Sequence, residues 1–394
     1  MRRAGLVFFA LISTAVAEPR IKQSFYLVNL SVDGKHALLQ ELTNGRDVLH
    51  YRVIEVDTKK IEADVELPAI ASLPMETLND GGGEKHGVKL DLANPALAKD
   101  LRVALQVLAK FPFGAGNRVA AQPDGAVVAF NVGDYIYTSN NGKIGKRLAN
   151  QASYAPWIMP DGASIMFRME NGLYPNSPIG RYEMYYSPLD GGAPPQRIAG
   201  TAGATDYWTI AKTGDVRILT TQETAKGQHA CIVEVNLVKP FRAVTKACLP
   251  DDERMVSGIL STRGTWAAFT TTKELDEIDP NAHTYVNNKR VPTKKQRFRF
   301  RTLDVDHDKV VVDDTREPMA AGAIDDNGLV VIERFRTTVI VDPIKKTFEQ
   351  TPRSLGILSS HFRAPGQLVV ERDGTVEVLD PTAGPRTPYV FTKP

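Results

Sequence analysis

A glycine-centred turn between two short β-type runs recurs along the whole chain. Clear copies are Gln122-Pro-Asp-Gly125 and Met159-Pro-Asp-Gly162, each followed by an apolar run. Such turns need a positive φ, which glycine adopts without a Cβ clash, so they predict β-hairpins. The seven turn glycines are Gly34, Gly125, Gly162, Gly214, Gly264, Gly328 and Gly366.

A second hairpin follows each of these turns. Its sign is an alternating strand that ends in a polar turn, as in Val339-Ile-Val-Asp342. Two hairpins in series make a four-stranded antiparallel sheet, and a series of such sheets is typical of a β-propeller. We therefore predict an all-β chain, a β-propeller with seven four-stranded blades.

The length of the chain agrees with this number of units. The chain has 394 residues, of which 377 follow residues 1–17. Two segments, 68–117 and 273–296, interrupt the β pattern, and 303 residues remain without them. Seven units of about 43 residues fit the roughly 40–45 typical of a propeller blade. We predict a single propeller domain over 18–394, with a β-sandwich or two smaller β domains as the alternative.

The third unit carries a resemblance to a known family. Its letters run Ala155-Pro-Trp157-Ile-Met-Pro-Asp-Gly162, then Tyr182-Glu-Met-Tyr-Tyr-Ser-Pro-Leu-Asp-Gly-Gly192 and Gln196-Arg-Ile198. This pattern resembles the TolB-type, WD-like β-propeller repeat, well over 119–200 and more weakly beyond. The resemblance implies a propeller fold and commonly a periplasmic interaction role. It implies no particular ligand, because propellers host many functions.

The N-terminus reads as a secretory signal peptide. Arg2 and Arg3 precede an apolar run, and Ala15 and Ala17 occupy the small-residue positions of a cleavage site. We expect cleavage after Ala17 and a periplasmic or secreted location, with an N-terminal core helix as the alternative. The apolar run is shorter than the about 20 residues that a membrane span needs, so no membrane span is predicted.

Overall charge gives no indication of a partner. The 48 Lys and Arg residues exceed the 46 Asp and Glu residues by the two arginines of the signal peptide. The chain that follows Ala17 is therefore neutral, and a charged partner must be recognised through local patches.

The two cysteines, Cys231 and Cys248, lie in β-type runs on either side of Lys239-Pro240. If that dipeptide forms the turn of a hairpin, residues whose numbers sum to 479 face each other. The numbers of the two cysteines have this sum, so the cysteines face each other. Facing Cα atoms about 4.5–5.5 Å apart are within disulfide range. We predict a structural disulfide, with two buried free thiols as the alternative, and no redox role because no C-x-x-C motif is present.

The two interruptions differ in character. In 68–117, Asn94-Pro95 can start a helix over about 95–110 with a leucine stripe, which predicts a helical insertion between the first two blades. In 273–301 an acidic stretch leads into a basic one, and Arg297-Phe-Arg-Phe-Arg301 alternates as a strand does. We favour a solvated hairpin whose charges compensate one another. The alternative is a docking surface, and no nucleic-acid partner is predicted.

No catalytic or metal motif stands out. The sequence contains neither a G-x-S-x-G elbow nor an H-E-x-x-H pair, and we predict no cofactor, no metal and no catalytic residue. Trp157 and Trp208 are interpreted as packing residues, and Asp124 and Asp161 as turn residues. A propeller can still form a site in its central channel, from segments just before the innermost strands. Possible ligand contacts there are Arg118, Tyr154, Asp206, Tyr207, Arg254 and His361.

Two functions remain open at this point. The first is an exported, non-enzymatic scaffold that binds a protein or a cell-envelope polymer. The second is a propeller enzyme of the polysaccharide lyase or hydrolase type, with its site in the channel. Convergence of His361, Asp206 and Arg254 would favour the enzyme, whereas an exposed apolar patch on one face would favour the scaffold.

Overall fold

The computed structural model describes residues 24–31, 33–42, 49–67, 75–79, 84–88, 119–122, 127–132, 135–140, 143–173, 180–190, 192–224, 227–249, 253–286, 289–314, 321–334, 336–357 and 360–389. All regular elements in these ranges are β-strands, which confirms the all-β prediction. The predicted signal peptide, the predicted helix over 95–110, Asp124 and Gly125 lie outside the described residues.

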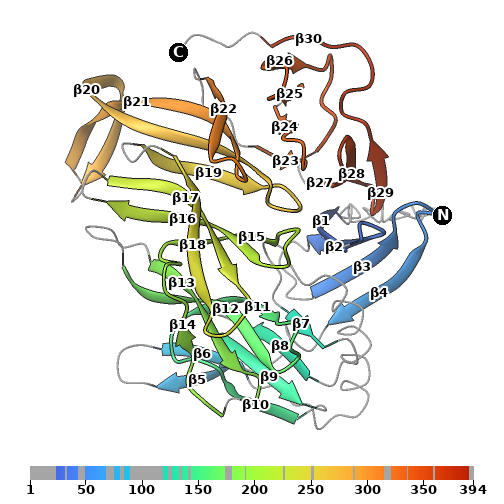
Figure 1. Ribbon diagram of the computed structural model, residues 1–394, viewed down its shortest axis with the longest axis vertical. Coiled ribbons are helices and arrows are strands. Elements are labelled where there is room, and N and C mark those ends of the chain that lie inside the picture. The colour runs from blue at the N-terminus through green and yellow to red at the C-terminus, as the bar shows by residue number, and fades with distance from the viewer. Residues whose placement is uncertain are drawn as a thin grey trace, which may run out of the picture.

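The first four large sheets are antiparallel and four-stranded, with the strands in chain order (Figure 1). The first contains β1 (Ser24–Leu30), β2 (His36–Leu42), β3 (Leu49–Glu55) and β4 (Ile61–Leu67). The second contains β7 (Val119–Ala121), β8 (Val127–Val132), β9 (Tyr135–Asn140) and β10 (Lys143–Arg147). The third contains β11 (Ser153–Ile158), β12 (Ser164–Leu173), β13 (Gly180–Pro188) and β14 (Gln196–Arg197). The fourth contains β15 (Ala204–Ile210), β16 (Val216–Thr224), β17 (Gly227–Asn236) and β18 (Arg242–Cys248).

The remaining sheets are less uniform. The fifth contains β19 (Arg254–Leu260), β20 (Trp266–Val286), β21 (Lys289–Asp304) and β22 (Lys309–Asp314). The sixth contains β23 (Ala323–Ile324), β24 (Val330–Glu333), β25 (Thr338–Asp342), β26 (Thr347–Gln350) and β30 (Thr387–Pro388), and the seventh contains β27 (Ser360–Ala364), β28 (Gln367–Arg372) and β29 (Thr375–Leu379). A separate hairpin of β5 (Met75–Asn79) and β6 (Glu84–Val88) lies in the first insertion.

Buried apolar side chains join successive sheets from the second to the seventh. Between the third and fourth sheets, the rings of Trp157 and Trp208 meet edge to face at 5.7 Å, which confirms that both are packing residues. The last sheet packs on the first, where Val369 and Val376 meet Phe25 and Leu27. In Figure 1 the blue N-terminal sheet accordingly lies beside the red C-terminal one. The series of sheets thus returns to its start, as the blades of a propeller do, and the predicted β-propeller is confirmed.

The described residues do not form seven equal four-stranded blades. The sixth sheet has five strands and the seventh has three. The difference arises because β30 pairs with β26 of the sixth sheet, placing Thr387 opposite Gln350, instead of adding to β29. An ion pair of 2.6 Å between Arg386 and Glu349 fixes this pairing.

The turn glycines have the conformation that the sequence predicts. Six of the seven, all but Gly125, are described, and each has a positive φ between 64° and 89°. Asp161 accepts hydrogen bonds from the backbone N–H groups of Ala163 and Ser164, as expected of a turn residue. Three of these turns, at Gly34, Gly264 and Gly328, also fit closely against the preceding sheet. A Cβ on Gly328 would lie 2.6 Å from the ring of Trp266, so this turn has no room for a side chain.

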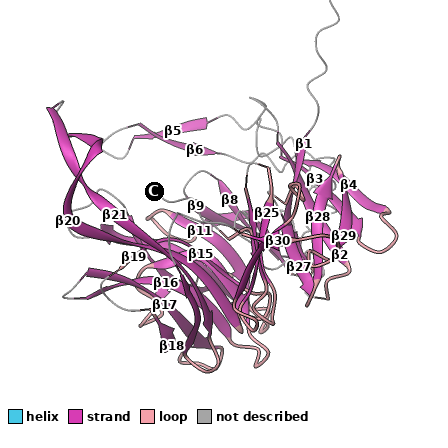
Figure 2. Cartoon of the chain, turned by 90° about the horizontal axis from the view of Figure 1, so that it is seen from above, coloured by secondary structure: helices cyan, strands magenta, loops and turns pink. Residues whose placement is uncertain are grey.

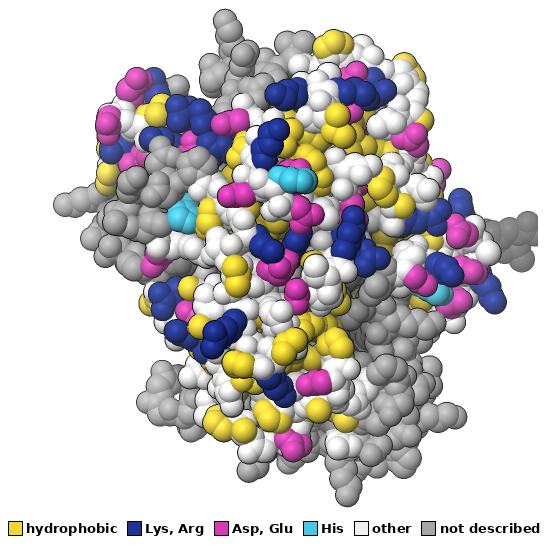
Figure 3. All heavy atoms as spheres, in the orientation of Figure 1, with side chains coloured by type: hydrophobic (Ala, Val, Ile, Leu, Met, Phe, Trp, Pro, Cys, Tyr) yellow, Lys and Arg dark blue, Asp and Glu magenta, His cyan; other side chains and the backbone are white. Residues whose placement is uncertain are grey.

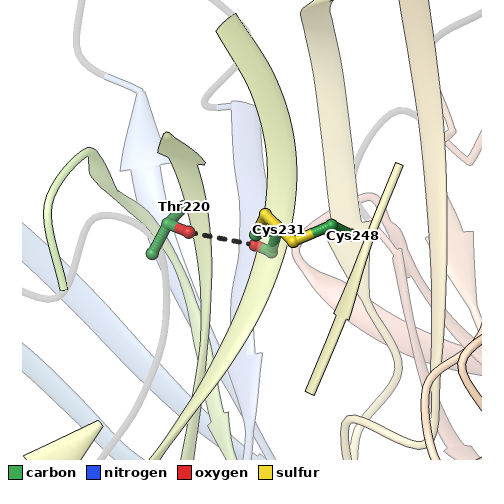
Figure 4. The surroundings of a disulfide bond; sticks show 3 residues. All are labelled: Thr220, Cys231 and Cys248. Carbon is green, nitrogen blue, oxygen red and sulfur yellow. Dashed lines mark hydrogen bonds between the residues drawn. A yellow bond between two sulfur atoms is a disulfide. The ribbon is translucent and has the colours of Figure 1, made fainter. Parts of the chain in front are cut away.

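The predicted disulfide is present in the fourth sheet (Figure 4). Cys231 faces Cys248 on the neighbouring strand, with a Cα–Cα distance of 4.1 Å and an S–S distance of 2.03 Å. The predicted register holds at the cysteines and then shifts by one residue, because a bulge between Ile232 and Val233 places Val233 opposite Thr245.

The two ends of the ring differ. We call the end at which the innermost strands begin the entry face, and the end that holds the turn glycines the turn face. Arg254 begins β19 and faces Thr272, so the parts of β20 and β21 over 273–297 extend beyond the entry face. Insertion 68–117 leaves β4 at the same face, because Leu67 pairs with Leu49 at the start of β3. Figure 2 shows β5, β6 and the far ends of β20 and β21 on one side of the ring.

Candidate functional site

Five of the six predicted channel residues lie within the innermost strands themselves, and not just before them. Tyr154 lies on β11, Asp206 and Tyr207 on β15, Arg254 at the start of β19, and His361 on β27. Tyr154, Arg254 and His361 are the first or second residues of their strands and therefore lie near the entry face, whereas Asp206 and Tyr207 lie mid-strand. Arg118, the sixth candidate, lies outside the described residues, as does the side chain of Asp206.

These residues have different surroundings. The ring of Tyr154 meets that of Tyr182 at 5.7 Å, and the guanidinium of Arg168 lies over both rings, so Tyr154 belongs to an aromatic–cation cluster of the third sheet. Tyr207 and Arg254 are exposed. Burial lowers the pKa of His361 to about 4 against an opposing hydrogen bond with the backbone of Val28, which leaves this imidazole neutral at neutral pH. Convergence of His361, Asp206 and Arg254 on one point stays the criterion for the enzyme alternative.

A buried carboxylate lies beside Arg254 on the fifth sheet. Glu253 is only 2% exposed, and its Oε2 accepts hydrogen bonds from Thr271 Oγ1 at 2.5 Å and from Arg301 Nη1 at 2.7 Å. Arg301 is 1% exposed and donates from Nε to Asp313 at 3.2 Å. Burying such charges is costly unless they are paired and hydrogen-bonded, and here both partners are.

Two further arginines share the same carboxylate. Arg297 and Arg299 approach Oε1 of Glu253 at 3.5 and 3.6 Å, and Arg299 also lies 3.5 Å from Asp313. Their side chains are 43% and 32% exposed. The arginines at 297, 299 and 301 lie on one face of β21, because alternate residues of a strand point to the same side. We call Lys295 and these three arginines the cation ladder.

Beyond the sheet, β20 and β21 form a two-stranded ribbon over 273–297 with charges of both signs. Lys294 pairs with Glu274 at 3.1 Å, and Lys295 pairs with Glu277 at 2.8 Å. Figure 3 shows basic and acidic side chains crowded together at the upper left, over β20 and β21. Ile278 and Val291 are exposed apolar residues of the same strands. The ribbon is thus partly self-compensating, as predicted, and also presents apolar groups to solvent.

A histidine clamp lies on the first sheet. Nδ1 of His50 is 2.5 Å from Glu41, and its Nε2 contacts Asp64, which also pairs with Arg52 at 3.1 Å. Burial disfavours the imidazolium, but the hydrogen bonds to Glu41 and Asp64 outweigh it and raise the pKa of His50. Arg52 also donates to the carbonyl of Gly374 at 2.8 Å, so the clamp ties the first sheet to the last.

Potential metal ligands meet at one place in the described part of the chain. His229, Cys231 and Cys248 have ligand atoms within 4.8 Å of one another. Two of these atoms are the sulfurs of the disulfide, which are not thiolates and do not act as metal ligands.

Membrane-spanning helices are a separate question. Among the described residues, no helix is long and apolar enough to cross a membrane.

Sequence patterns identified the basic run of β21 but not the carboxylate beneath it. Glu253 ends an acidic stretch, Asp251-Asp252-Glu253, just before an innermost strand, and this is the only local signal. Its partner Arg301 is 48 residues further along the chain, and only the sheet register brings the two together. The His50 clamp has no local signal, because its members come from three different strands.

Comparisons with known proteins find likeness in structure alone. A scan of protein-family models and a search of curated proteins both find no match. Among solved structures, hydrazine synthase of Kuenenia stuttgartiensis is 11% identical with a TM-score of 0.44, covering 95% of this chain and 99% of that one. An oligogalacturonate lyase in complex with manganese is 8% identical with a TM-score of 0.45, covering 92% and 90%. A putative TolB from Agrobacterium tumefaciens is 15% identical with a TM-score of 0.34, covering 74% and 80%. Likenesses at this level assign no ligand, reaction or residue role to the chain.

Proposed function

We propose that this chain is an exported, non-enzymatic β-propeller that binds a protein or a cell-envelope polymer at its entry face. The observation that carries the proposal is the ribbon of β20 and β21. These two strands extend on that face beyond the other strands of the fifth sheet. A strand pair that leaves its sheet adds little to the core of the ring, so its length needs another reason. The ribbon presents charges and the apolar side chains of Ile278 and Val291 to solvent, the mixture typical of an interaction surface.

Export forms part of the proposal and rests on Met1 to Ala17. Sequencing the N-terminus of the protein recovered from the cell envelope tests it. We expect the recovered chain to begin at Glu18. A chain that retains Met1 and stays inside the cell would contradict export.

Binding is tested by capture of envelope proteins and polymers with the mature chain, beside a variant without the ribbon. Lys273 pairs with Arg297, so 274–296 can be replaced by an Asn-Gly turn that leaves the rest of the sheet in register. We expect the intact chain to retain a partner and the trimmed chain to lose it. A second variant without 68–117 shows whether the other insertion contributes.

The enzyme alternative is decided with the same preparation. A lyase or hydrolase would convert members of a glycan library, and the loss of His361 or Arg254 would abolish that conversion. Glycan turnover without any retained partner would overturn the scaffold proposal.

A further inference from the structure

Among the described residues, strand β21 is paired on one side only over its outer half. Its pairing with β20 runs from Asp304 to Lys289, whereas β22 pairs with Phe300 to Asp304 alone. Over 289–299, β20 is thus the one partner strand among the described residues. Pro292 has no N–H group to offer, which leaves 293–299 as the stretch that a further strand can join.

The cation ladder follows the same stretch. Lys295, Arg297 and Arg299 alternate with Gln296 and Phe298. Two residues of a strand span about 6.8 Å, so the ladder offers one positive charge at each such step on one face. An extended peptide beside β21 has the same repeat.

The three arginines of the ladder share two carboxylates, those of Glu253 and Asp313. Lys295 pairs with Glu277, and the charge of Asp279 also acts on it, so the charge of Lys295 is compensated. Contacts of 3.5 and 3.6 Å from Arg297 and Arg299 to Glu253 are too long for hydrogen bonds. Each guanidinium has five N–H donors, so both arginines retain donors for an outside acceptor.

We propose that residues 293–299 of β21 bind an acidic peptide segment in an extended conformation, which joins the ribbon as an additional strand. The backbone of the segment pairs with the open edge, and carboxylates at alternate positions meet Arg297 and Arg299. The inference rests on the proposed function and names the class of its partner, a protein with an acidic extended segment.

Fluorescence anisotropy with a labelled peptide of alternating Glu and Thr residues tests the proposal on the intact mature protein. We expect saturable binding that weakens as salt is added. Arg297→Glu and Arg299→Glu should each weaken it by about tenfold or more, since each replaces attraction by repulsion. Arg297→Gln and Arg299→Gln, which retain hydrogen-bonding groups, should have smaller effects in the same direction.

Lys294→Glu is the matched control. Lys294 lies on the same strand with its side chain 43% exposed, the same as Arg297, but it belongs to the opposite face of the ribbon. This variant should change the affinity by less than about twofold, because a screened charge on the far face makes no contact with the segment. Equal losses from Lys294→Glu and Arg297→Glu would overturn the assigned face. Unchanged thermal unfolding shows that each variant is folded.

A peptide N-methylated at alternate residues separates strand addition from simple charge attraction. It retains every carboxylate but lacks the N–H groups that pair with β21, and we expect it not to bind. Binding equal to that of the parent peptide, or binding of dextran sulfate without binding of the peptide, would overturn the proposal. If the peptide fails to bind while the mature chain still captures an envelope partner, the inference fails and the proposed function stands.

Discussion

Two arginine networks lie on opposite faces of the ring and differ in how fully their charges are paired. On the turn face, Arg217 donates to Glu234 at 2.8 Å, to Asp306 at 2.7 Å and to the carbonyl of Gly264 at 2.9 Å. On the entry face, three arginines share Glu253, and two of them reach it only at 3.5 and 3.6 Å.

The difference separates structure from binding. The Arg217 network joins the fourth and fifth sheets, and each of its three guanidinium nitrogens has a close acceptor. The network around Glu253 holds Arg301 in the same way but leaves Arg297 and Arg299 with donors that a partner can use. A closed network stabilises the ring, and an open one can bind a ligand.

The largest expected effect is on the closed network. Arg217→Ala removes the guanidinium and leaves Glu234 with Lys246 as its remaining ion-pair partner. This substitution should lower the free energy of unfolding by about 3–5 kcal/mol. Arg297→Ala, at a half-exposed position, should lower it by less than about 1 kcal/mol. Urea unfolding followed by circular dichroism measures both. Equal losses would remove the distinction between the two networks.

The next effect concerns the turn glycines. Gly366 and Gly328 both have a positive φ, but a Cβ on Gly366 meets nothing within 4 Å, whereas one on Gly328 strikes Trp266. Gly366→Ala should cost about 1–2 kcal/mol from the backbone conformation alone. Gly328→Ala should cost a further 1–3 kcal/mol or so from overpacking. Thermal unfolding of the pair measures the difference, and equal costs would show that this contact between the fifth and sixth sheets is not tight.

The smallest effect is the titration of His50. Because the folded pKa lies above the ordinary 6.5, the clamp contributes its full stability below that value and loses it as the pH rises through the folded pKa. The Arg217 network has no such dependence, since a guanidinium remains charged. The stability difference between the parent and His50→Gln should therefore shrink as the pH rises above 6.5. A difference that grows with pH would contradict the assigned charge state.

Features that depend on neighbouring residues could be predicted from the sequence. The turn glycines follow from Asp-Gly and similar pairs, and the disulfide follows from two alternating runs about one turn. The packing of Trp157 and Trp208 follows from their place before those turns. Each of these rests on a local rule with a physical cause, namely a positive φ, the repeat of two or the reach of a disulfide.

Features that depend on register over long distances could not be predicted. Glu253 meets Arg301 across an intervening strand, and β30 pairs with β26 after the whole seventh sheet has intervened. No pattern within a few residues encodes such pairings. The hairpin of β5 and β6 differs from them because it is local, and the Asp80-Gly81 pair between its strands is a hairpin signal that a helical interpretation of 68–117 leaves unused.

Hydrogen–deuterium exchange on the mature protein, with and without the alternating acidic peptide, tests the central claim most directly. Backbone amides that pair with an added strand are protected from exchange, and amides near a merely attracted charge are not. The account predicts new protection over 293–299 of β21, and none at β10, which is an edge strand of the second sheet. Protection at β10 instead, or no protection on the ribbon at saturating peptide, would contradict it.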